Sequence, residues 1–296
     1  MNLRDVGEDR LLERILPKLP TNRDVVRGAG DDCALVRFGN ADDLLVLKTD
    51  CVVERVHFKP ETRGADVGWK AMARPLSDFA ATSAVPRFAM ITVIAPASTA
   101  VARIESIYRG ITKAARRFEV AIVGGEMSAT PGPLAISISI TGSIEDGREV
   151  TRAGGKPGDE IFVTGTLGGS IRAKHLSFVP RIEESRWLTS RFRVHAMMDL
   201  SDGIGADLPR LAHASGVAFE LDEASLPRTR GCTVKQAISD GEDYELLFAV
   251  GANESERLQR EWQKKFPKLA LTRIGRLVRQ SKMQSRKLPR GYVHFA

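Results

Sequence analysis

The sequence lacks paired cysteines, long apolar runs and the common nucleotide-binding loops, and each absence excludes a class of protein. Its three cysteines form no CxxC pair, so neither a disulfide framework nor a cysteine-rich zinc site is indicated. No apolar run reaches the roughly 18 residues of a membrane span, and the N-terminus MNLRDVGEDRLLERILPKLP is too charged for a secretory signal. These features predict a cytoplasmic protein without a membrane partner.

Two frequent nucleotide-binding solutions are missing, because the chain has neither a GxxxxGK[ST] loop nor the protein-kinase signature set. The five histidines show no paired ligand spacing, which argues against a His/Cys zinc hydrolase. The net charge of +7 arises mainly between Arg257 and Arg290. This charge is spread over a predicted helix, a strand and a tail, as is typical of a solvated face, so no nucleic-acid partner is expected.

Apolar periodicity predicts strands and helices in both halves of the 296 residues, which indicates an α/β or α+β fold. Clustered turn residues at 154–159 place a domain boundary near residue 148, giving domains 1–147 and 148–296. The predicted strands are 44–50, 88–94, 120–123, 134–140, 161–164, 217–221 and 269–275, and the predicted helices are 65–84, 98–118, 253–265 and one after 203.

Acidic residues recur in turns that contain Gly, Ser or Thr and lie beside apolar segments. Each alone is a common helix cap or turn, since Asp and Ser accept bonds from free backbone N–H groups. Several carboxylates at strand ends also suit magnesium, which prefers oxygen ligands, and neighbouring glycines let backbone N–H groups approach phosphate. The five clusters are 28–32, 48–50, 76–78, 124–126 and 199–203.

A series of motifs along nearly the whole chain resembles the thiamine-monophosphate kinase family. The motifs are GDDCAL (30–35), TD…VHF (49–58), LSDFAA (76–81), GGE (124–126), TRAGGKPGD (151–159), DLSDG (199–203), GEDYEL (241–246) and GYVHF (291–295). The resemblance implies a two-domain PurM-like fold, with an N-terminal domain that contributes to a dimeric β-barrel and a C-terminal α/β domain that closes the nucleotide site. It also implies a homodimer that transfers the γ-phosphoryl group of ATP to thiamine monophosphate.

The same resemblance implies that several magnesium ions and the positioning of the substrates promote the transfer, with no general base from the protein. ATP is the implied co-substrate. The implied metal residues are Asp32, Thr49, Asp50, Asp78, Glu126, Asp199 and Asp202. Gly125, Arg152 and Ser201 would contact ATP, and His57, Glu242, Asp243 and Tyr292 would lie near the thiamine phosphate.

Several positions depart from the family pattern, and four of them bear on the expected site. Glu126 replaces an aspartate, Lys48 a small hydroxyl residue, and Arg55 and Asp240 each replace a glycine. A working kinase would adapt its metal shell to the longer Glu126, whereas in a divergent paralogue Glu126 would pair with a cation such as Lys48. An ATP-dependent enzyme acting on another small substrate and a nucleotide-binding protein with little catalysis therefore remain alternatives.

Overall fold

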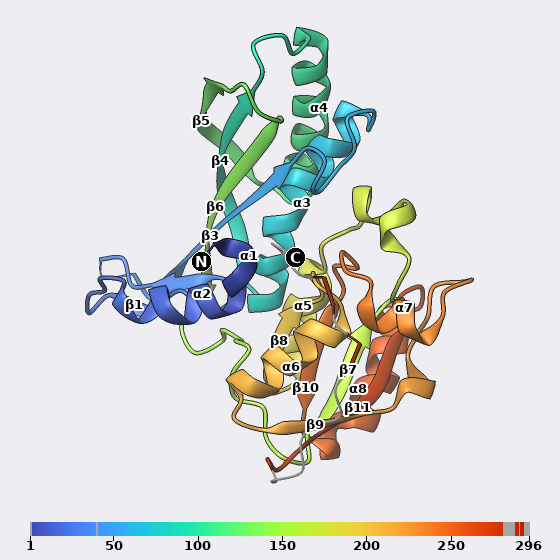
Figure 1. Cartoon of the computed structure of the whole chain (residues 1–296). Helices are drawn as coiled ribbons and strands as arrows, with labels where there is room; N and C mark the ends of the chain where they lie inside the picture. Colours follow the sequence, from blue (N-terminus) through green and yellow to red (C-terminus); the bar gives the residue numbers. More distant parts are fainter. Residues whose placement is uncertain (1, 40, 281–287, 290, 293–296) are drawn as a thin grey trace.

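The computed structural model describes residues 2–39, 41–280, 288–289 and 291–292 (Figure 1). The first domain is built on a six-stranded sheet with the order β1-β2-β3-β6-β4-β5. Only β4 and β5 pair in parallel; the other neighbours are antiparallel. The strands are β1 (Val25–Arg27), β2 (Ala34–Val36), β3 (Asp43–Val53), β4 (Val85–Ala95), β5 (Ala121–Ala129) and β6 (Ala135–Glu145).

Two long helices, α3 (Gly64–Thr82) and α4 (Val101–Arg117), lie together on one side of this sheet (Figure 1). Residues of β3 and β6 alternate between buried and more exposed, so one face of the sheet enters the core beneath α3. Before the sheet, the chain forms the short helices α1 (Leu3–Val6) and α2 (Glu8–Ile15) and the 3₁₀ turn η1 (Leu16–Lys18).

Where α3 and α4 cross, a glycine of each helix faces the backbone of the other helix. A Cβ on Gly68 would lie 1.9 Å from the carbonyl oxygen of Ile107, and a Cβ on Gly110 would lie 1.9 Å from that of Ala65. Both distances are far shorter than any real Cβ contact. The close crossing of α3 and α4 therefore requires glycine at both positions.

The second domain contains a five-stranded antiparallel sheet with the order β8-β10-β7-β11-β9. Every residue of β10 is buried, and its side chains alternate between two apolar clusters on opposite faces. Helices therefore cover both faces, as in a three-layer α/β/α arrangement. The strands are β7 (Glu160–Thr164), β8 (Val194–Asp199), β9 (Ala218–Leu221), β10 (Leu246–Val250) and β11 (Leu271–Val278).

One face of this second sheet packs against α6 and α7, and the other packs against α5 and α8. Ala80 of α3 belongs to the second of these clusters, so the long helix of the first domain continues into the core of the second. The helices are α5 (Ile182–Arg191), α6 (Ile204–Ala214), α7 (Val234–Ser239) and α8 (Ala252–Lys265), with the 3₁₀ turns η2 (Ser170–Arg172), η3 (Lys174–Leu176) and η4 (Glu223–Ser225).

The mixed α/β class and all predicted strands and helices are confirmed, with shifted ends. The predicted strand 120–123 continues as β5 to Ala129, across the glycines of the GGE motif. The prediction did not include β1, β2, β8, β10, α1, α2, α5 or α7. Most of these are short, and β10 begins at the last residue of the GEDYEL motif (241–246), which the sequence analysis relates to chemistry alone.

Strand β5 forms an unpaired edge of the first sheet, and all nine of its residues are exposed. Val123 and Met127 are 59% and 62% exposed, and Phe88 and Met90 of the neighbouring β4 are each 52% exposed. A long, apolar edge strand is a template for pairing with another chain.

Among the helices of the described residues, none is long and apolar enough to cross a membrane.

We expect Gly110→Ala to lower the free energy of unfolding by about 2 kcal/mol or more, because the added methyl group pushes α4 away from the backbone of α3. Urea denaturation of the purified chain measures the effect. Gly28→Ala is the matched control, because its Cβ would meet only Val25 at an ordinary 3.6 Å. Equal stability of the two variants would show that the helices can separate freely.

Candidate functional site

A cavity of about 920 Å³ lies where the two domains meet. Its wall combines the loop 28–32, the middle of β3, one face of α3, the end of β8 and the segment 239–244. This volume is within the range of small-molecule sites. Of the candidate site residues, the cavity is lined by Asp32, Thr49, Asp50, His57, Asp78, Arg152, Asp199, Ser201, Asp202, Glu242 and Tyr292.

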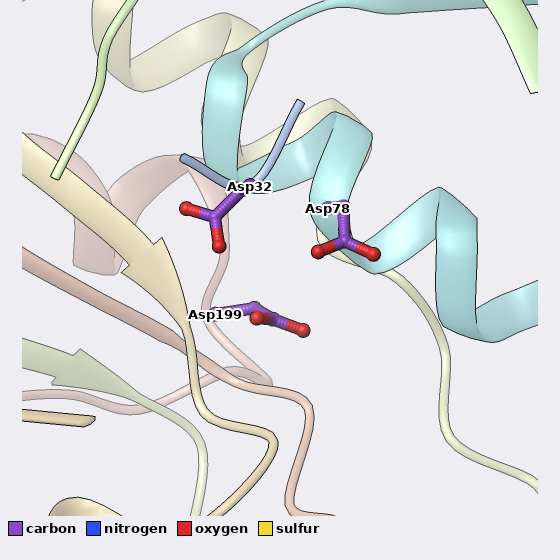
Figure 2. Close-up of side chains that lie close together, drawn as sticks. All are labelled: Asp32, Asp78 and Asp199. Carbon is purple, nitrogen blue, oxygen red and sulfur yellow. The ribbon is translucent and has the colours of Figure 1, made fainter. Parts of the chain in front are cut away.

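Three aspartates that line the cavity lie close together (Figure 2). Asp32 comes from the loop before β2, Asp78 from α3, and Asp199 is the last residue of β8. Each offers a carboxylate oxygen, and these three oxygens lie within 4.8 Å of one another. All three residues are buried, so the grouping is part of the packed domain junction.

Within the described residues, each of these carboxylates pairs with one side chain. Arg152 donates to Asp32 Oδ1 from Nη2 at 2.5 Å and from Nε at 3.1 Å. Ser77 Oγ donates to Asp199 Oδ2 at 2.6 Å, and Lys48 Nζ lies 2.9 Å from Asp78 Oδ1. Asp32 Oδ2 is buried and has no hydrogen-bond partner among the residues that the structure describes. A buried acceptor of this kind costs free energy unless something binds it, so it marks an open ligand position.

The electrostatics of the aspartates indicate a shortage of positive charge. Burial and the proximity of Asp32 raise the pKa of Asp199 to about 6. Burial, with Asp199, Asp50 and Asp32 nearby, raises the pKa of Asp78 well above its usual range although Lys48 opposes this. Crowded carboxylates of this type are what a divalent cation stabilises, and magnesium prefers oxygen ligands. The aspartate cluster of Asp32, Asp78 and Asp199 therefore fits magnesium.

A row of charged residues on α3 was not identified from the sequence. Lys70, Arg74 and Asp78 are spaced four residues apart, so they share one face of a largely buried helix. Arg74 Nη1 donates to the carbonyl of Cys51 at 2.6 Å, and its Nε lies 3.3 Å from Asp50 Oδ2. Charged residues at this spacing in a buried helix were the signal that could have revealed Lys70 and Arg74.

Lys70 has a fully buried side chain and links three segments. Its Nζ donates to the His57 carbonyl at 2.6 Å and to Glu242 Oε1 at 2.6 Å, and lies 2.8 Å from His175 Nδ1. Burial lowers the pKa of Lys70 to about 8, although Glu242 opposes the shift. Burial would raise the pKa of Glu242, but His175 and Lys70 lower it to about 2. Glu242 is thereby fixed as a carboxylate at the cavity wall.

Asp240 and Asp243 both hold the short turn that follows Gly168. Gly169 N donates to Asp240 Oδ2 and Gly168 N to Asp243 Oδ2, each at 2.9 Å. Ser170 also donates to the other carboxylate oxygen of Asp243. Asp243 is buried and does not line the cavity. The replacement of a glycine by Asp240 thus has a structural reason, since its side chain fastens the turn.

Asp202 and Ser201 line the cavity beside the aspartate cluster. Arg210 Nη1 donates to Asp202 Oδ2 at 2.5 Å and to Asp207 Oδ1 at 3.0 Å. Tyr292 reaches the cavity from the C-terminal segment, where its backbone N donates to the carbonyl of Asp202 at 3.0 Å. The following residues of the GYVHF motif, 293–295, lie outside the described part of the chain.

Residues of β3 divide between the two faces of the sheet. Lys48 and Asp50 point toward α3, as their ion pairs with that helix show. The intervening Thr49 is exposed on the opposite face, where its Oγ1 accepts a hydrogen bond from Ser139 at 3.1 Å. Since side chains alternate along a strand, the hydroxyl of Thr49 points away from the aspartate cluster.

Gly125 and Glu126 on β5 do not line the cavity. Asp50 pairs with β6, β6 pairs with β4, and β4 pairs with β5, so Gly125 is three strands, about 14 Å, from Asp50. A Cβ on Gly125 would lie 1.9 Å from the Ile91 carbonyl oxygen, so close strand approach alone requires this glycine. Lys48 pairs with Asp78 and not with Glu126, which accepts a bond from Ser128.

The cavity wall carries an excess of negative charge. Four lysine or arginine side chains, Lys48, Arg74, Arg152 and Arg210, face nine carboxylates. A polyphosphate cannot approach such a wall unless cations neutralise it. The carboxylates are those of Glu8, Asp31, Asp32, Asp50, Asp78, Asp199, Asp202, Asp240 and Glu242.

The raised pKa of Asp199 predicts a pH-dependent stability. A carboxyl group whose pKa is about 6 in the folded chain and 3.8 in the unfolded chain stabilises the fold below pH 4, and this contribution is lost as the pH rises through 6. In EDTA, the unfolding free energy of the natural chain minus that of Asp199→Asn should therefore increase by about 1 kcal/mol from pH 7.5 to pH 5. If urea denaturation gave unfolding free energies that change equally with pH in the two proteins, this prediction would be contradicted.

Comparison with known proteins gives consistent matches over most of the chain. Residues 30–144 match the AIR synthase related protein, N-terminal domain, and residues 156–284 match the AIR synthase related protein, C-terminal domain. A thiamine-monophosphate kinase from Rhodopirellula baltica is 36% identical, over 91% of this chain and 92% of the relative. One from Bacillus subtilis is 30% identical, over 94% and 93% of the two chains.

The fold is also similar to that of a solved structure. The structure of AaThiL complexed with AMPPCP and TMP has a TM-score of 0.85 and 29% identity, over 99% of both chains. These matches confirm the two-domain PurM-like fold and the resemblance inferred from the motifs. The chain belongs to the thiamine-monophosphate kinase family, built from the two domains of the AIR synthase related proteins.

Proposed function

We propose that this protein transfers the γ-phosphoryl group of ATP to thiamine monophosphate and so forms thiamine diphosphate. The observation that carries the proposal is the buried group of Asp32, Asp78 and Asp199 in an interdomain cavity of about 920 Å³. Relatives of this chain are thiamine-monophosphate kinases, and one related structure holds AMPPCP and TMP. Phosphoryl transfer depends on positioning and charge neutralisation more than on covalent help, which suits a carboxylate-rich site.

Magnesium in this proposal is held by Asp32, Asp78 and Asp199, with Asp50 and Asp202 at the edges of the same wall. When bound, the ions neutralise the carboxylates and the phosphate oxygens and thus allow the two anionic surfaces to meet. The open Oδ2 of Asp32 supports this assignment, because no donor in the described part of the chain bonds to it. Thr49 is assigned a structural role in β3, since its hydroxyl accepts a hydrogen bond from Ser139.

Arg152 and Ser201 are proposed to contact the phosphates of ATP. Arg152 is already oriented by its two bonds to Asp32, which leaves part of its guanidinium free to face the cavity. Ser201 follows Asp199 by two residues and lies on the same wall. The reaction then needs these residues to align the two phosphates and exclude water, and no general base from the protein is assigned.

His57, Glu242 and Tyr292 are proposed to surround the thiamine monophosphate, since all three line the cavity. Lys70 fixes two of these residues at once through the His57 carbonyl and the Glu242 carboxylate. Asp243 is assigned an indirect role, because it holds the turn at Gly168 rather than facing the cavity.

We also propose a homodimer that forms through the first sheet. The exposed edge β5 and the apolar residues of β4 and β5 support this arrangement, which would join two sheets into a β-barrel. Gly125 and Glu126 lie on this edge and are remote from the cavity of their own chain. They would therefore serve the ATP and metal site of the partner chain.

The division at 147/148 falls between the end of β6 and the start of β7, which supports domains 1–147 and 148–296. Cytoplasmic location is part of the same proposal, because ATP is the phosphoryl donor.

Phosphoryl transfer is tested by incubating the pure protein with ATP, magnesium and thiamine monophosphate, and measuring thiamine diphosphate. Asp78→Asn should lower the rate at least 100-fold, because it removes a charge from the aspartate cluster. Asp146→Asn is the matched control, since this residue pairs with Arg37 and does not line the cavity. Absence of thiamine diphosphate with the natural chain would refute the proposed activity.

The homodimer is tested with the double variant Val123→Lys/Met127→Lys. Light scattering should give the mass of two 32.4 kDa chains for the natural protein and of one chain for the variant, because buried lysines oppose strand pairing. Val101→Lys replaces an apolar residue on α4 that is even more exposed, at 73%, and should stay dimeric. A single-chain mass for the natural protein at micromolar concentration would exclude the dimer.

A further inference from the structure

We infer that the ammonium group of Lys48 occupies one cation position of the aspartate cluster, so that this chain binds one divalent ion fewer than it would with a neutral residue there. The inference rests on the proposed magnesium site. Lys48 stands where the family pattern has a small hydroxyl residue, and the expected effect is on the number of bound metal ions and not on turnover.

The position of Lys48 is fixed by the fold. It lies on the face of β3 that packs toward α3, and its Nζ is 2.9 Å from Asp78 Oδ1. The two side chains are only 23% and 11% exposed, so the contact is sheltered from solvent. An ion pair in such a place is screened less by water and salt than one at the surface.

The charges of the cluster explain why this ammonium matters. Three carboxylates bring three negative charges, and Lys48 and Arg152 each bring one positive charge. The protein therefore leaves about one uncompensated negative charge, which a single divalent ion more than balances. With a small hydroxyl residue at position 48, two negative charges would remain, and Asp78 Oδ1 would be free to bind a second ion.

Arg152 cannot take over this role. It donates to Asp32, a different member of the cluster, and Ser77, which is neutral, is the partner of Asp199. Lys48 is thus the cation next to Asp78 among the interactions of the described residues. A lysine ammonium is a compact point charge with three donors, so it can stand in the place of a metal ion, whereas the planar guanidinium of arginine is shaped for paired bonds.

The inference is tested by counting bound ions. Free Mn²⁺ is measured by electron paramagnetic resonance during titration of the full-length protein with MnCl₂. Lys48→Ser and Lys48→Met should each bind one Mn²⁺ more per chain than the natural protein at the same free Mn²⁺ concentration. The double variant Lys48→Ser/Asp78→Asn should lose that extra ion, because the second ligand set is then incomplete. Lys48→Met keeps the length of the side chain, so it provides a second folded variant if serine leaves a gap.

Lys264→Met is the matched control, because this exposed lysine of α8 lies outside the cavity and its loss changes the net charge equally. It should bind as many ions as the natural chain. Equal ion counts for the natural protein and both neutral variants would overturn the inference, as would an extra ion that persists in the double variant. Thiamine diphosphate formation is measured separately, so failure of the kinase activity and failure of the ion count are distinguishable.

Discussion

The rest of the site depends on the mutual repulsion of three buried carboxylates at the domain junction. Asp32, Asp78 and Asp199 lie too close together to be ionised without compensation, and burial together with the nearby Asp32 raises the pKa of Asp199 to about 6. Lys48 and Arg152 supply part of the compensation from β3 and from the start of the second domain. Burying this much charge destabilises the free protein, and it is also what makes the cavity receptive to metal ions and phosphates.

Helix α3 organises both the packing and the chemistry of the molecule. Its apolar face fills the core of the first domain, Ala80 enters a core of the second, and its indole at Trp69 donates to the carbonyl of Phe178 at 2.8 Å. The charged face carries Lys70, Arg74 and Asp78 at successive turns, and of these Arg74 and Asp78 line the cavity. A rigid helix places these groups more precisely than a loop would, because the packing on both sides locks their rotamers.

Sequence reasoning predicted the longer elements because their periodicity was undisturbed, as in β3 and α4. The resemblance of the chain's motifs to a known family placed Asp32, Asp78 and Asp199 in one metal site, and the structure brings these three residues together from separate elements. Sequence reasoning could not show that Gly125 is three strands from Asp50, since pairing order is a long-range property. Nor could it show which partner Lys48 takes: the ion pair with Asp78 depends on how α3 packs on the sheet.

The contacts of α3 also limit how the molecule can change during evolution or in chimeric engineering. Ser77 donates to Asp199, and Lys70 donates to Glu242, so residues of the first domain have their partners in the second. Two halves taken from different relatives would therefore combine a helix and a cavity wall that were not selected together. The chain has the outline of two modules, yet these buried cross-domain pairs make the halves poorly interchangeable. Substitutions on α3 and in the segment that contains Glu242 are expected to be inherited as matched sets.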